Sequence, residues 1–112
     1  MFAHREFNGE ILIEELEQLR DAQVRQKQLD DCANVLRSLS GMRVSAAQRR
    51  VQQIADGRFQ SQPALANLLV RLSSKLRNES DVAALVLHFR RLALAGALIG
   101  AIRRGSDRVV AG

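Results

Sequence analysis

The stretch that decides the fold is SDVAALVLHFRRLALAGALIGAIRR, from Ser80 to Arg104, which is the longest apolar segment of the chain. Wound as a helix at about 100° per residue, it has apolar residues on both sides. A helix that is apolar nearly all round is normally the buried centre of a bundle, or shows its second face to a partner. We therefore predict a central helix over 81–104, with one face made of Val82, Leu85, Val86, Phe89, Ala93, Gly96 and Gly100 and the other of Leu87, Leu94, Leu98 and Ala101.

Small residues are concentrated in the C-terminal half of this stretch, LALAGALIGAI. Glycine inside a soluble helix costs about 1 kcal/mol relative to alanine, so two glycines one turn apart need a structural reason. Close approach of a second helix is such a reason. We predict that the chain self-associates and that the contact is made by Phe89, Ala93, Gly96, Ala97 and Gly100.

Small residues at this spacing also occur where membrane helices dimerise. The unbroken uncharged run from Leu92 to Ile102 has only eleven residues, however, and His88, Arg90 and Arg91 precede it. A helix needs about 20 apolar residues to span a bilayer. The sequence therefore favours a core helix and predicts no membrane contact.

The N-terminal third has two apolar stripes that do not align. Leu12, Leu16 and Leu19 form the first stripe, and the second resumes at Leu29, rotated by roughly 90° on an ideal helix. Either one long helix changes partner midway, or two helices meet at a joint between Ala22 and Gln28. Because nothing in that segment is a helix breaker, we favour one helix over 9–40 that ends near Gly41.

The middle of the chain predicts two shorter helices. Ser45 followed by Gln48 matches a capping box for a helix over 46–56, and Pro63 suits the first turn of a helix over 63–77. Residues 1–8 are predicted to be an irregular lead-in and 105–112 a frayed tail. The expected fold is an all-α single domain, 1–112, built as a four-helix bundle, or a five-helix bundle if the first helix is divided.

Charge is distributed unevenly along the chain. The net charge is +5, but residues 1–31 carry a balance of −4 and residues 32–112 a balance of +9. Fifteen of the seventeen bases are arginine, a residue that binds carboxylates and phosphates in a forked geometry. A GC-rich genome would also produce this arginine excess, and composition does not distinguish the two explanations. No apolar segment follows a basic N-terminus, which predicts a cytoplasmic location, or the host-cell interior for a viral or phage protein.

Residues capable of catalysis or metal binding are few. The chain has two histidines, His4 and His88, and one cysteine, Cys32. Zinc sites need about four Cys, His or carboxylate ligands at defined spacings, and none of those spacings is present. We expect His88 to be a satisfied core histidine and Cys32 to be a small buried residue. The sequence predicts no enzyme activity, no metal, no cofactor and no small-molecule substrate.

An alternative hypothesis is binding to the phosphate backbone of nucleic acid without base recognition. Helices 46–56 and 63–77 have the outline of a helix-turn-helix, although their connection is longer than the usual three or four residues. The arginines that would contact phosphates are Arg43, Arg49, Arg50, Arg58 and Arg71. The preferred hypothesis is a non-enzymatic interaction protein, such as a small regulator, inhibitor or subunit, that binds a protein partner and forms homo-oligomers.

Overall fold

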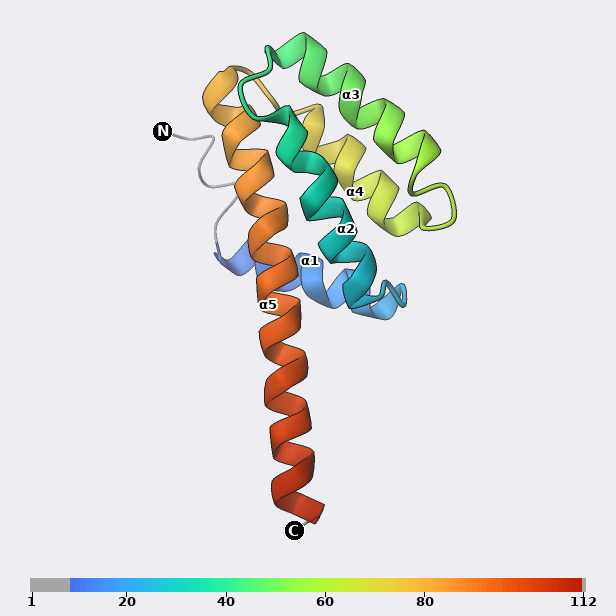
Figure 1. Ribbon diagram of the computed structural model, residues 1–112, viewed down its shortest axis with the longest axis vertical. Coiled ribbons are helices and arrows are strands. Elements are labelled where there is room, and N and C mark those ends of the chain that lie inside the picture. Colours follow the sequence, from blue (N-terminus) through green and yellow to red (C-terminus); the bar gives the residue numbers. More distant parts are fainter. Residues whose placement is uncertain (1–8, 112) are drawn as a thin grey trace.

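The helix α5 (Glu79–Ala111) is the longest element, and the other helices pack along its N-terminal half (Figure 1). The computed structural model describes the backbone of residues 9–111 and the side chains of residues 12–102. Within this range every regular element is a helix and there is no strand, which confirms the all-α prediction. The elements that precede α5 are α1 (Gly9–Asp21), α2 (Gln26–Leu36), the short 3₁₀ helix η2 (Arg37–Leu39), α3 (Val44–Gly57) and α4 (Pro63–Ser73).

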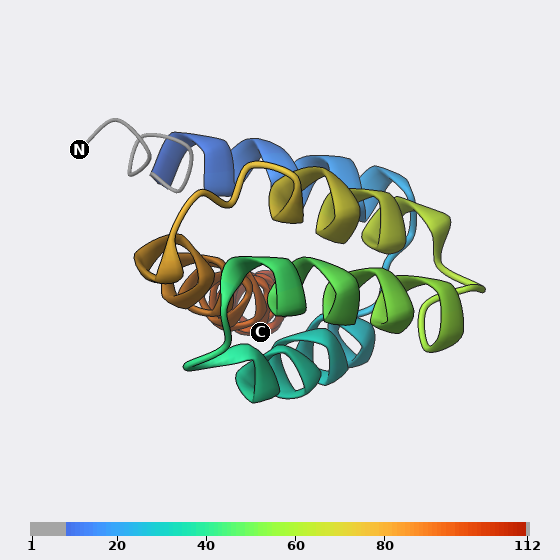
Figure 2. The ribbon, with the colours of Figure 1, turned by 90° about the horizontal axis from the view of Figure 1, so that it is seen from above.

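The core lies between the N-terminal half of α5 and the four shorter helices, which Figure 2 shows grouped around α5 seen nearly end-on. Leu85, Phe89 and Leu92 of α5 are completely buried there. The C-terminal half of α5 extends beyond this globule (Figure 1), and the molecule is 53 Å along its longest axis. Its radius of gyration is 14.9 Å, larger than the value of about 13 Å for a compact domain of this length.

The prediction of one helix over 9–40 is wrong, because α1 and α2 are separated by a four-residue connection, 22–25. Gln23 has a φ of 61°, in the left-handed region. The Val24 N–H donates to the Leu19 carbonyl (2.8 Å), and the Gln23 N–H donates to the Arg20 carbonyl (2.9 Å). These two hydrogen bonds form a Schellman motif, which ends a helix and normally has glycine where Gln23 stands.

The rotation between the two apolar stripes explains why the chain breaks here. On one straight helix Leu19 and Leu29 would point in different directions, but in the structure both are buried in the same core. A non-glycine residue in the left-handed conformation costs roughly 1–2 kcal/mol. Burying one leucine side chain contributes about 1.5–3 kcal/mol, which offsets that cost.

α3 and α4 form an antiparallel helical hairpin, lying side by side in both Figure 1 and Figure 2. A helix-turn-helix requires its two helices to cross at about 90–120°, so that outline is not realised. The predicted capping box is also wrong, because α3 begins at Val44, before Ser45. The Gln48 Nε2–H instead donates to the Ser73 carbonyl at the end of α4 (3.1 Å), and this hydrogen bond joins the two helices.

The C-terminal ends of α4 and α5 differ from the predictions by one to two turns, whereas the remaining boundaries of α3, α4 and α5 agree to within two residues. α4 begins at Pro63 as predicted but ends at Ser73, because the following N–H groups of Lys75 and Leu76 bond to carbonyls three residues back. α5 begins at Glu79, where the Asn78 side chain accepts the Asp81 N–H (3.0 Å). The predicted tail from residue 105 is helical as far as Ala111. The predicted lead-in, 1–8, lies outside the described residues.

Two glycines provide a matched test of the backbone. Gly41 has a φ of 82°, whereas Gly57 is the last residue of α3, and an added Cβ would meet no atom within 4 Å at either position. We expect Gly41→Ala to destabilise the protein by about 1 kcal/mol, since alanine is strained in the left-handed region. Gly57→Ala should be neutral or stabilise by up to about 1 kcal/mol. Urea denaturation checks both, and equal effects of the two substitutions would contradict the assigned backbone conformations.

Candidate interaction surface

Cys32 and the side chains that could bind a metal ion are placed by the structure as follows. Cys32 lies in the core with no exposed surface, and burial raises the pKa of its thiol far above the usual value. Among residues 12–102, no three His, Cys, Asp or Glu side chains are grouped so that they could hold a metal ion. Cys32 is therefore a small core residue, as the sequence predicted.

His88 and Glu15 form a buried polar pair that joins α1 to α5. The His88 side chain is 1% exposed and Glu15 is 5% exposed. The distance from His88 Nε2 to Glu15 Oε2 is 2.5 Å, which makes this a short hydrogen bond. The prediction that a neighbour satisfies His88 is confirmed. The sequence did not reveal Glu15 as that neighbour, because Glu10, Glu14 and Glu17 lie on the same helix and their spacing does not select one of the four.

The residues predicted for self-association lie mainly on the side of α5 that faces its own globule. Phe89 is completely buried and Ala93 is 7% exposed. The Gln26 side chain of α2 lies over Gly96 and donates from Nε2 to the Ala93 carbonyl (2.6 Å), so a Cβ at Gly96 would collide with Gln26 Oε1. Gly100 is half-buried and Ala97 is exposed. The close approach inferred from the small residues is therefore made within the chain, by α2.

The opposite side of α5 carries large apolar side chains that are exposed to solvent. Four of them recur at helical spacing, and we call them the outer face: Leu87, Leu94, Leu98 and Ile102. Leu94 and Leu98 are 66% and 62% exposed, and Ile102 is 59% exposed. Leu87, Leu94 and Leu98 were identified from the sequence as a second apolar side. Covering a large apolar side chain contributes more to binding than covering a small one. The large size of these side chains was therefore the signal in the sequence that favours this side of α5 as a binding surface.

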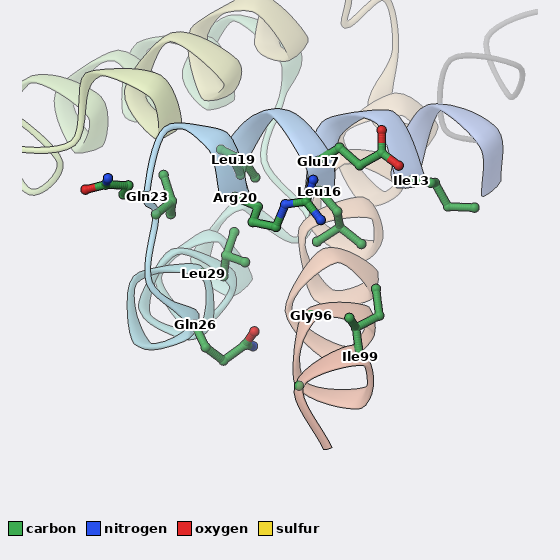
Figure 3. Close-up of a pocket in the computed structure, with 12 residues that line it drawn as sticks. Ile13, Leu16, Glu17, Leu19, Arg20, Gln23, Gln26, Leu29, Gly96 and Ile99 are labelled. Carbon is green, nitrogen blue, oxygen red and sulfur yellow. The ribbon is translucent and has the colours of Figure 1, made fainter. Parts of the chain in front are cut away.

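A groove of about 410 Å³ lies beside the outer face, between α1, the start of α2 and α5 (Figure 3). Leu16 of α1 and Leu29 of α2 point toward it (Figure 3), and Gly96 and Gly100 line it on α5. Ile13 and Ile99 border it and are 57% and 42% exposed. The apolar surface of α5 therefore continues onto α1.

The arginines predicted to bind phosphate do not form one surface. All five are exposed, and none has an ion pair with a described residue. Arg71 borders a hollow with Glu15 and Gln18, so it lies on the α1 side of α4. Arg50 follows Gln48 by about 200° around α3, so it points away from α4. Arg43 and Arg58 flank α3 at opposite ends, about 20 Å apart. Arg49 and Arg50 are neighbours at exposed positions within α3 itself.

The stretch Glu79–Ile102 of α5 is long and apolar enough to cross a membrane. By itself this is weak evidence, because the core helix of a soluble protein meets the same criterion. In this fold Leu85, Phe89 and Leu92 of that stretch are buried against the other helices.

Comparison with protein-family models, with curated protein sequences and with solved structures found no match for this chain.

Proposed function

We propose that this chain is a non-enzymatic interaction protein that binds a protein partner through the outer face of α5. The observation that carries the proposal is the exposure of Leu94 and Leu98, each above 60%, on the side of α5 that points away from the buried Phe89. Scattered exposed leucines are common in soluble proteins, but a contiguous apolar patch usually marks an interaction site.

The energetics of the outer face support binding. Fully burying an exposed leucine contributes about 1.5–3 kcal/mol. Leu94 and Leu98 are 66% and 62% exposed, so burying their remaining surface would contribute about 2–4 kcal/mol together. The lower value corresponds to a change of about 30-fold in Kd. Their burial requires no rearrangement of the core, because Phe89 and Leu92 already fill it from the other side of the helix.

The test is a capture experiment with Leu94→Gln and Leu98→Gln combined in one variant. The matched control is Ser45→Gln with Ala46→Gln, which adds two glutamines at exposed positions of α3. We expect the wild type and the control to retain the same proteins from an extract of the native host, and the α5 variant to lose them. An identical set of proteins for all three chains would contradict the proposal.

Binding to the phosphate backbone remains a second candidate, supported by the exposed arginines of α3. Replacing Arg49 and Arg50 together by alanine should weaken binding to duplex DNA. It should also reduce the slope of log K against log salt concentration by about 2, roughly one per lost phosphate contact. Arg71→Ala is the control, because Arg71 borders α1 instead. An unchanged salt slope for the double variant would exclude these two residues as contacts.

A further inference from the structure

We infer that the partner of the outer face is a second copy of this chain. The two α5 helices pair antiparallel, and the two-fold axis of the dimer passes between them at the level of Gly96. This inference rests on the proposed function, because it uses the same exposed face. Its evidence is the order of large, small and charged residues along α5.

The outer positions of α5 follow the seven-residue spacing of a two-stranded coiled coil. Leu87, Leu94 and Ala101 are seven residues apart, and Arg91 and Leu98 lie between them at the second apolar position of each heptad. All five are exposed, so none of them is used by the fold of one chain.

Antiparallel pairing about Gly96 makes these positions complementary. In this register the numbers of two residues that lie opposite each other add up to 192. Leu94 of each copy therefore packs against Leu98 of the other copy, which gives two equivalent leucine pairs. Arg91 lies opposite Ala101, whose small side chain leaves room for the arginine stem to cover apolar surface while the guanidinium reaches water.

Parallel pairing would be electrostatically unfavourable. It would place Arg91 opposite Arg91 within the seam, and like charges facing each other across an interface cost several kcal/mol. It would also bring together the two C-terminal ends, where residues 103–108 contain three arginines and one aspartate. In the antiparallel pair residues 103–108 lie opposite residues 84–89 of the partner helix, a segment that contains no aspartate, glutamate, lysine or arginine.

The fold leaves space for this pairing. The globule lies against the inner side of α5, where Phe89 and Ala93 are buried, and the C-terminal half of the helix extends beyond it (Figure 1). In the antiparallel pair each extension lies along the outer face of the other copy. The two globules are then at opposite ends and on opposite sides of the helix pair.

Cross-linking of introduced cysteines tests the orientation. Arg91→Cys and Ala101→Cys are made as separate full-length variants and treated with a short bismaleimide, alone and as a mixture. We expect a cross-linked dimer in the mixture and none with either variant alone, because identical positions are about 15 Å apart in the antiparallel pair. The native Cys32 is buried, so the unmodified chain and an Ala46→Cys variant on α3 should give no dimer.

The other outcomes overturn the inference in distinguishable ways. Cross-linking of Arg91→Cys to itself would show a parallel dimer, which contradicts the orientation but not the use of the outer face. A monomeric mass by light scattering across a dilution series would exclude the second copy, while loss of captured proteins by the Leu94→Gln, Leu98→Gln variant would still support the proposed function. If the chain bound only to lipid vesicles, and the Leu94→Gln, Leu98→Gln variant did not bind them, the outer face would be a membrane-binding surface. That result would contradict both the second copy and the protein partner.

Discussion

Replacing Glu15 by alanine is expected to lower the free energy of unfolding by about 3–5 kcal/mol, the usual effect of removing one partner from a buried ionisable pair. Glu15 is the residue of α1 that accepts the hydrogen bond from His88, and both side chains are almost completely buried. Small domains are stable by only about 5–15 kcal/mol, so the change removes a large part of the total. Urea denaturation followed by circular dichroism measures it.

Glu14 provides the matched control, because it is the neighbouring residue on α1 and its side chain is exposed. Glu14→Ala should change stability by no more than about 0.5 kcal/mol. Glu15→Gln should lie between the two alanine variants, since an amide oxygen can still accept a hydrogen bond from His88. If Glu15→Ala and Glu14→Ala were equally stable, the contact with His88 would contribute nothing and α1 would be held by its leucines alone.

The sequence was sufficient to predict that His88 is buried with a hydrogen-bond partner, but not to predict that the partner is Glu15. A histidine within an apolar helix has to be satisfied if it is buried, so its environment was predictable from α5 alone. Its partner lies 73 residues away on a helix with several other acids, and only the tertiary arrangement selects Glu15. Side chains that pair locally can be inferred from spacing, whereas this pair cannot.

The break between α1 and α2 was also only partly predictable from the sequence. The misaligned apolar stripes of Leu19 and Leu29 indicated that the helix is interrupted between them. The left-handed conformation that ends α1 occurs at Gln23, a residue with no preference for that region. The hydrophobic pattern therefore outweighed the local backbone preference. At Gly96 the small residue correctly indicated the close approach of a second helix. The contacting residue is Gln26 of α2, which belongs to the same chain.

The two sides of α5 should respond very differently to truncation. Phe89→Ala is expected to destabilise the protein by about 3–5 kcal/mol, because Phe89 is completely buried and its removal leaves a cavity among the core leucines. Leu98→Ala is expected to change the stability of the monomer by no more than about 0.5 kcal/mol, because 62% of the side chain is already in water. Thermal unfolding at low protein concentration compares them directly.

Protein concentration then separates folding from association. A partner that binds only the folded state raises stability by mass action, so association through the outer face makes the melting temperature of the wild type rise with concentration. Leu98→Ala should lose most of that rise while keeping the melting temperature of the dilute wild type. If Leu98→Ala instead destabilised the dilute protein as much as Phe89→Ala does, Leu98 would belong to the core of the monomer, and the outer face would not be a binding surface.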